Sequence, residues 1–253
     1  MEKYFADVHA SPASQLGSQP HGLTDTPEVA SLRDAQTYGD LLALGKALCF
    51  QLRCREAVEV YSKAIALCPE DIRGYRQRAA RYLTTLRPKP AIRDFHRCRE
   101  LGGDAMDISY RLGLCRYYAG DYEGAMPELE RCYPLCDEEM GIAVIYWHTL
   151  SAWRAGAQPV LLKQHYHPEM KVGHHRAYAF AMSAAAGHIS MKDAMERLKT
   201  EADDLEFSIM AYGVAQQLEP PEKEALTRQL LERDGFWISY AYLAAWNDTY
   251  GGG

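Results

Sequence analysis

The sequence predicts an all-α fold, a solenoid of stacked helical hairpins. Small, bulky and aliphatic residues recur every 34 positions in the first half of the chain. This period is typical of repeats made of two antiparallel helices that stack on their neighbours. In the second half, turns that contain glycine or proline separate apolar segments of helical length. We expect no strands.

Five columns of residues define the repeat. Each column has three members: Gly45, Ala79 and Gly113; Ala57, Ala91 and Ala125; Tyr61, Phe95 and Leu129; Ala64, Cys98 and Cys132; Leu67, Leu101 and Leu135. The first two columns are small and let the two helices of one hairpin approach closely. The third is bulky and fills the groove between the helices, and the last closes the apolar face of the second helix. The fourth is expected to touch the next repeat.

At these columns the chain resembles the tetratricopeptide repeat (TPR) family. The resemblance is to bacterial-type TPR proteins. The family motif of L-G followed by A, F/Y, A and P is present in the first copy as Leu44-Gly45, Ala57, Tyr61, Ala64 and Pro69. The third copy lacks the final proline, and Arg87-Pro88-Lys89-Pro90 replaces the usual turn in the second. The likeness covers about residues 38–137. It implies a right-handed superhelix whose first helices line a concave groove, and a role in protein binding.

The N-terminal residues 1–25 are expected to form a flexible tail, because residues 10–24 are polar and show no apolar periodicity. The fold is expected to begin at Thr26, an N-cap candidate followed by Pro27 and Glu28. TPR-like repeats then fill residues 26–137. Degenerate hairpins and a C-terminal cap fill residues 138–250 and continue the repeats.

The second half is predicted to contain seven further helices. Their boundaries follow the turn signals at Gly156, Gly187, Pro220-Pro221 and Asp234-Gly235. The expected ranges are 139–155, 158–165, 174–186, 190–200, 203–218, 221–233 and 236–247.

The last of these helices is rich in aromatic residues. Phe236, Tyr240, Leu243 and Trp246 share one helical face. One interpretation is a capping helix that seals the final hairpin, because terminal repeats are atypical. The alternative is an exposed aromatic stripe through which two copies form a homodimer.

Composition excludes several classes of protein. The chain has 28 basic and 34 acidic residues and a net charge of -6, which argues against a nucleic acid partner. No apolar run reaches the length of a membrane helix or a signal peptide, so we expect no membrane association. Seven cysteines, mostly in core columns, are expected to be reduced thiols in a cytoplasmic protein.

The family's register places a candidate peptide-binding groove on the first helix of each repeat. Its residues combine cationic, amide and aromatic side chains: Lys46, Phe50, Arg73, Arg76, Gln77, Tyr110, Arg111, Tyr117 and Tyr118. Arginine binds carboxylates through two parallel hydrogen bonds, so such a groove suits an extended peptide with acidic groups. The alternative interpretation is an ordinary solvated helix surface.

Two further patterns contain side chains that could carry chemistry. Four histidines and Glu169 lie within residues 165–175 and could ligate a divalent ion, but their spacing is not that of a metal site. We interpret them as residues of a connection in which Gly173 permits a sharp bend and imidazoles cap carbonyl groups. Cys132 and Cys136 form a CxxxC pair whose first member already belongs to a packing column.

The sequence thus predicts a non-enzymatic adaptor that binds a peptide or protein segment, with no catalytic residues, cofactor or metal. Gly-rich phosphate loops, nucleophile elbows and HExxH helices are absent from the sequence. The alternatives are a homodimerisation module that uses the C-terminal aromatic helix, and a histidine-rich metal protein.

Overall fold

The computed structural model describes residues 11–16 and 24–251, and all regular elements in these ranges are helices. The predicted all-α class is therefore confirmed for the part of the chain that is described. The chain divides into two compact units, residues 1–104 and 105–253. The division falls between the second and third copies of the predicted repeat.

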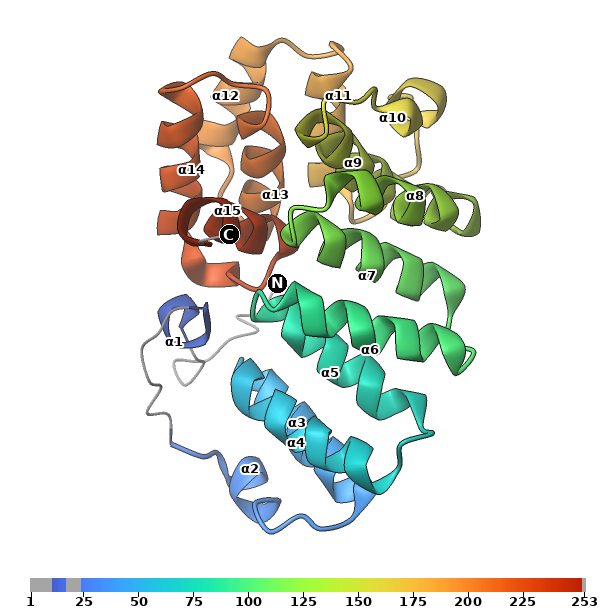
Figure 1. Cartoon of the computed structure of the whole chain (residues 1–253). Coiled ribbons are helices and arrows are strands. Elements are labelled where there is room, and N and C mark those ends of the chain that lie inside the picture. Colours follow the sequence, from blue (N-terminus) through green and yellow to red (C-terminus); the bar gives the residue numbers. More distant parts are fainter. Residues whose placement is uncertain (1–10, 17–23, 252–253) are drawn as a thin grey trace. The chain divides into compact units, whose positions relative to one another are not determined.

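Unit 1 consists of two helical hairpins preceded by two short helices (Figure 1). The helices are α1 (Pro12–Leu16), α2 (Pro27–Ser31), α3 (Tyr38–Phe50), α4 (Cys54–Leu67), α5 (Ile72–Thr84) and α6 (Pro88–Glu100). Thr26 caps α2 as predicted, since its hydroxyl accepts a 3.5 Å hydrogen bond from the amide of Val29. Helices α3 and α4 pack as one hairpin, and α5 and α6 as the next.

Helix α1 lies within the segment that was predicted to be a flexible tail. The side-chain oxygen of Gln15 accepts a 3.1 Å hydrogen bond from the amide of Arg55, and Arg55 Nε donates a 2.7 Å bond to the Gln15 carbonyl. Gln15 thus occupies one of the amides that the first turn of α4 leaves without a helical partner. Residues 1–10 and 17–23 of the predicted tail lie outside the described residues.

The first small column allows the close approach that the sequence predicted, whereas Leu67 and Leu135 of the last column are 53% and 52% exposed and do not close the apolar face as expected. A Cβ atom on Gly45 would overlap the Tyr61 ring across the α3–α4 hairpin. A Cβ atom on Gly113 would lie 2.6 Å from Leu129 Cγ in the third copy. Because a real Cβ essentially never comes so close to another heavy atom, these glycines set how closely the two helices of each hairpin approach.

A further column, missed in the sequence, ends the first helix of each copy. Leu52, Leu86 and Gly120 are 34 residues apart, and their φ angles are +56°, +54° and +75°. A left-handed residue is common directly after a helix and is most often glycine. In two copies this residue is leucine, so a pattern of turn glycines does not reveal the column.

Unit 2 begins with the third hairpin. Its elements are α7 (Ala105–Tyr118), α8 (Tyr122–Cys132), η1 (Tyr133–Leu135), α9 (Glu138–Arg154), α10 (Val160–His165), α11 (Arg176–Ala185), α12 (Met191–Thr200), α13 (Asp204–Ala215), α14 (Glu222–Glu232), η2 (Asp234–Phe236) and α15 (Tyr240–Tyr250). Six of the seven predicted ranges match a helix within three residues at each end. The last begins at Tyr240 and not at Phe236, because Ser239 caps it by accepting a 3.0 Å hydrogen bond from the amide of Tyr242.

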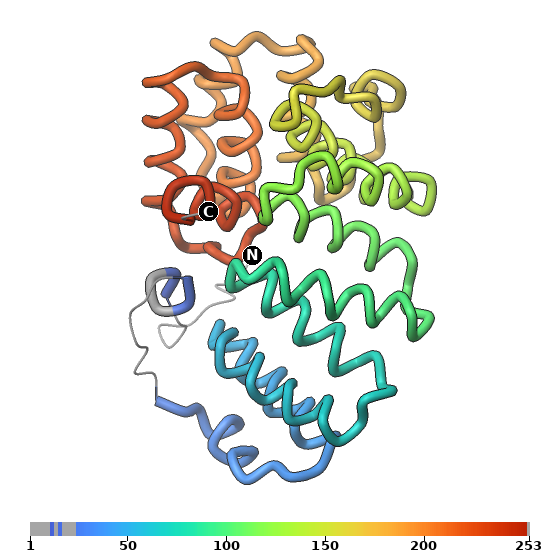
Figure 2. The backbone as a smooth tube through the Cα atoms, in the orientation of Figure 1, coloured from blue at the N-terminus to red at the C-terminus, as the bar shows by residue number. Residues whose placement is uncertain are grey.

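The first helices of the hairpins in unit 2 converge on one aromatic core. Tyr117 of α7 and Tyr212 of α13 share a 2.8 Å hydrogen bond between their hydroxyls, and Tyr117 packs edge-on against Trp147 of α9. Tyr146 of α9 packs edge-on against Tyr178 of α11. Figure 2 shows the end of unit 2, in dark red, returning beside its beginning, in green. Helix α15 closes this core from the side of α7 and α13.

Candidate functional site

Five of the predicted groove residues lie in unit 1, on what we call the α3–α5 face: Lys46, Phe50, Arg73, Arg76 and Gln77. Lys46 and Phe50 are one turn apart on α3, and the Lys46 ammonium lies 5.8 Å from the centre of the Phe50 ring. Phe50 is 59% exposed, which is unusual for so large an apolar side chain. Its ring is therefore available to a ligand.

Arg73 brings the first turn of α5 against α3. Its guanidinium lies 5.3 Å from the centre of the Tyr38 ring and forms a 2.6 Å ion pair with Asp71. Arg73 and Gln77 are exposed, one turn apart, and Arg76 is half-buried between them. Arg73 thus lies near the start of α3, whereas Phe50 is the last residue of that helix, so a groove that joins the two sets stays a prediction.

The other four predicted groove residues, in unit 2, face the interior of that unit and not solvent. Tyr110, Tyr117 and Tyr118 are 8%, 3% and 4% exposed. Tyr118 donates a 2.7 Å hydrogen bond to the carbonyl of Tyr240, and the Tyr110 ring packs edge-on against the Tyr240 ring. Tyr110 and Tyr118 are covered by α15, and Tyr117 by Tyr212 of α13, so a peptide cannot reach these three side chains.

Arg111 is likewise engaged within unit 2. It donates 2.8 Å hydrogen bonds to the carboxylate of Asp107 and to the hydroxyl of Tyr240. The expected role of Arg111 in binding a ligand carboxylate is not supported by this arrangement, because an acidic side chain and a phenol already occupy its donors.

The aromatic C-terminal segment is largely internal. Leu243 is fully buried, and Tyr240 and Trp246 are half-buried. Helix α15 packs on α13 and α14, which agrees with the capping interpretation, and it also covers α7. Tyr250, 62% exposed, lies outside the stripe that was proposed for dimerisation.

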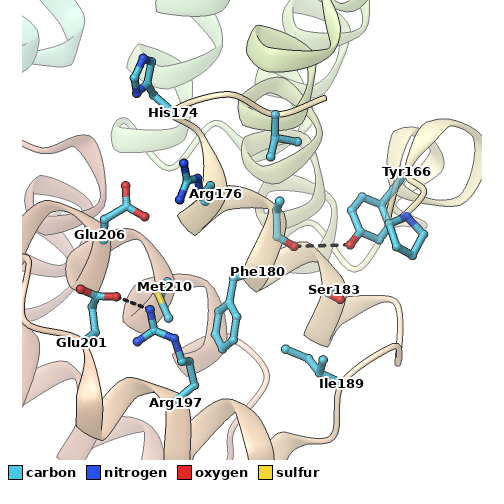
Figure 3. A pocket seen from close by; sticks show the side chains of 13 residues that line it. Tyr166, His174, Arg176, Phe180, Ser183, Ile189, Arg197, Glu201, Glu206 and Met210 are labelled. Atoms are coloured by element: carbon cyan, nitrogen blue, oxygen red, sulfur yellow. Dashed lines mark hydrogen bonds and ion pairs between the residues drawn. The ribbon is translucent and has the colours of Figure 1, made fainter. Parts of the chain in front are cut away.

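Unit 2 contains a pocket of about 640 Å³ between α11 and α13, here called the α11–α13 pocket. Its walls come from the connection after α10, from one face of α11, from α12 and from α13. The lining residues include His174, Arg176, Phe180, Ile189, Arg197, Glu201, Glu206 and Met210. In Figure 3 the Phe180 ring lies at the centre of the pocket, between Arg197 and Ile189.

Charged groups of both signs surround this apolar floor. Arg197 donates a 2.6 Å hydrogen bond to Glu201 on one side. Arg176 is exposed, and neither Arg176 nor Glu206 forms an ion pair within the described residues. Burial and the nearby carboxylates of Asp203 and Glu201 raise the pKa of Glu206, while Arg176 opposes this change. The pocket can therefore offer a ligand an apolar contact, a cation and a carboxyl group together.

The connection of residues 166–175 is held by the first turn of α9. Glu138 accepts a 2.7 Å hydrogen bond from the amide of Lys171, and Glu139 accepts a 2.8 Å bond from the amide of His174. His175 Nδ1 contacts the carbonyl oxygen of Glu139, and Gly173 has a φ of +48°. The predicted bend at Gly173 and the capping of a carbonyl by imidazole are both confirmed.

The histidines of this connection are dispersed in the structure. The His165 ring lies 4.4 Å from the Tyr133 ring, and His167 lies 3.5 Å from Glu169. In residues 11–16 and 24–251, no three His, Cys, Asp or Glu side chains gather where they could hold a metal ion. In the same ranges, no helix has the length and apolar character required to cross a bilayer.

No family model matches the chain. The resemblance to tetratricopeptide repeats therefore stays a prediction, based on the repeat columns and on the close approach of the helices at Gly45 and Gly113.

Sequence reasoning missed the α11–α13 pocket. Its residues come from three helices and two connections, and the longest periodic set is on α11, where Arg176, Ala179, Phe180 and Ser183 share one face. That spacing could have marked α11 as a helix with one accessible mixed face. The partners on α12 and α13 could not have been found from local spacing.

Proposed function

We propose that this chain is a non-enzymatic TPR-type protein that binds a segment of another protein. The observation that carries the proposal is the α11–α13 pocket, where the apolar floor around Phe180 and Met210 lies beside Arg176 and Glu206. Partners of such modules bind through an apolar anchor, with flanking charged groups that set orientation.

The dimensions of the pocket favour a peptide segment. Along α11 the lining residues run from Arg176 to Ser183, seven positions apart, which corresponds to about 10 Å at a rise of about 1.5 Å per residue. An extended peptide covers that distance with about three residues. A segment with an apolar residue between an acidic and a basic residue would complement Phe180, Arg176 and Glu206.

The test is selection of peptides from a random display library on the purified chain, followed by affinity measurement for the selected peptides. Arg176→Glu and Phe180→Ala are expected to weaken binding about tenfold or more, because each removes one of the proposed contacts. Lys192→Glu is the matched control, since Lys192 is exposed on α12 and does not line the pocket. Equal binding by all three variants would contradict the proposed site.

The α3–α5 face is a second candidate surface for the same function, favoured by the exposure of Phe50 beside Lys46. Phe50→Ser and Arg73→Glu are expected to reduce binding of peptides that this face selects. Leu67→Ser and Lys63→Glu are the controls, because both residues are exposed on α4. Peptides that lose affinity only for the Phe50 and Arg73 variants would assign the function to unit 1.

Self-association through α15 stays the alternative. Its test is the molar mass in solution of the full chain and of a Trp246→Ala variant. A dimer that dissociates in the variant would favour self-association over capture of a peptide.

A further inference from the structure

Two cysteine thiols meet at the junction between α8 and α9. Cys132 is the last residue of α8, and Cys136 follows the short helix η1. Their sulfur atoms are 3.7 Å apart. All seven cysteines of the chain lie within the described residues, and none of them is in a disulfide.

The backbone explains why the two thiols share one side. Residues Tyr133–Leu135 form a single tight turn, and the amide of Cys136 donates a 3.1 Å hydrogen bond to the carbonyl of Tyr133. Positions four apart on a helical path lie on the same face. Cys136 then leaves the helix with an extended ψ of 151° and precedes Asp137, the N-cap of α9.

The two thiols differ in accessibility. Cys132 is fully buried, and its sulfur also contacts the carbonyl of Met106 at 3.4 Å. Cys136 is half-exposed. A reagent in solution therefore reaches Cys136 first, with Cys132 directly behind it.

Cys136 also differs in acidity from two buried cysteines of the chain. The hydrogen bond with Cys132 lowers the pKa of Cys136, against the effect of burial. Burial raises the pKa of Cys54 to about 12, and it also raises the pKa of Cys115. Since the thiolate is the nucleophile, Cys136 is better suited to react than these buried thiols.

We propose that Cys132 and Cys136 form a reversible intramolecular disulfide when the protein meets a hydroperoxide. The Cys136 thiolate attacks the peroxide and becomes a sulfenic acid, with release of hydroxide or alkoxide. The Cys132 sulfur then attacks the Cys136 sulfur, forms the S–S bond and expels the sulfenic oxygen as water. Overall, two thiols are oxidised and one hydroperoxide is reduced, and a dithiol reductant reverses the change.

The required movement is small and local. The sulfur atoms must close from 3.7 Å to the S–S bond length of about 2 Å, which rotations of the two side chains provide. Cys132 would turn away from the carbonyl of Met106 and shift the last turn of α8. Tyr133, between the two cysteines, packs against His165, the last residue of α10, so the end of that helix would move with the change.

The protease sites of the chain make the experiment simple. Trypsin cleaves after Arg131 and Arg154, so both thiols fall in one peptide, residues 132–154. The folded chain is treated with hydrogen peroxide, its remaining thiols are alkylated after unfolding, and the peptides are analysed by mass spectrometry. We expect peptide 132–154 to escape alkylation, to lose the mass of two hydrogens and to recover both thiols after reduction.

Cys68 is the internal control, because it is also half-buried but contacts no other thiol within the described residues. Its peptide, residues 64–73, is expected to lose its thiol at least about tenfold more slowly than peptide 132–154. Equal rates for the two peptides would overturn the proposal, as would a disulfide between Cys136 and any other cysteine.

Two variants separate the roles of the pair. Cys136→Ser should leave Cys132 reduced after peroxide treatment. Cys132→Ala should fold, since Ala64 fills the same repeat column, and should accumulate a Cys136 sulfenic acid that dimedone traps. If Cys132 is oxidised equally fast in the Cys136→Ser protein, the assigned order of reaction is wrong.

Discussion

The hydroxyl of Tyr118 donates a 2.7 Å hydrogen bond to the backbone carbonyl of Tyr240, 122 residues further along the chain. Asn247 of the same helix α15 returns a 3.1 Å bond to the carbonyl of Tyr118. The first and last helices of unit 2 are thus joined by reciprocal hydrogen bonds, and α15 is part of the core of the unit.

Tyr118→Phe is expected to destabilise unit 2 by about 1 kcal/mol, because it removes one buried hydrogen bond and keeps the ring. The measurement is urea unfolding followed by circular dichroism. Tyr250→Phe is the control and should leave the midpoint unchanged, because Tyr250 is 62% exposed. A Tyr118→Phe midpoint equal to that of the native chain would mean that the bond contributes nothing to stability.

Gly113→Ala is expected to cost about 1–3 kcal/mol, since the added methyl would force Leu129 out of its position. Gly39→Ala provides the contrast. It also lies in a helix, but nothing lies within 4 Å of its added Cβ, so a gain of about 0.5–1 kcal/mol is expected from helix propensity. Opposite signs in thermal unfolding would verify the packing role of the column, and a gain for both variants would refute it.

His148 makes unit 2 sensitive to mild acid. Burial lowers its pKa below the usual 6.5, although Glu130 at 3.1 Å from Nε2 acts in the opposite direction. The folded chain therefore holds neutral histidine, and the unfolded chain binds the proton more readily. Stability from this group is complete above about pH 6.5 and falls as the pH drops below that value.

The check is the urea midpoint at several pH values between 5 and 8 for the native chain and for His148→Gln, whose amide nitrogen replaces Nε2. The native midpoint should fall more steeply between pH 6.5 and 5 than that of the variant. Parallel curves would show that His148 titrates alike in the folded and unfolded chains.

Asp25 makes unit 1 sensitive to stronger acid. The hydrogen bond from Arg33 holds the pKa of Asp25 well below its usual 3.8, and Arg53 adds a second bond of 2.7 Å. Because the folded pKa is depressed, this stabilisation is present above about pH 4 and is lost as the pH falls further. Asp25→Asn should reduce the acid sensitivity of unit 1, as measured by hydrogen exchange of α4 amides at pH 5 and pH 3. If the α4 amides of the native chain and of the variant lose protection by the same factor between pH 5 and pH 3, Asp25 does not cause the acid sensitivity.

The sequence predicted the helices well because their information is local. Thr26 and Ser190 mark helix starts, and Gly156 and Gly187 mark helix ends, through signals that depend only on neighbouring residues. The small columns also carried correct tertiary information, since Gly45 faces Tyr61 and Gly113 faces Leu129. A repeat makes such contacts predictable from sequence, because a small residue and a bulky residue recur at the same two positions of each copy.

The candidate site was less predictable. The TPR register placed Tyr117 and Tyr118 on the groove side of their helix, but it could not indicate that α13 covers Tyr117 and that α15 covers Tyr118. That contact joins segments more than 90 residues apart and belongs to no repeat column. The α11–α13 pocket was missed for the same reason, because Phe180, Arg197 and Met210 come from different helices.

The return of α15 to α7 has an evolutionary consequence. In an open stack, hairpins can be duplicated or lost at the end, because every interface has the same form. In unit 2, one more hairpin after α14 would carry α15 away from Tyr118 and leave the aromatic core uncovered. The number of hairpins in unit 2 is therefore fixed by its own closure, and changes in length should be confined to its connections, such as residues 166–175.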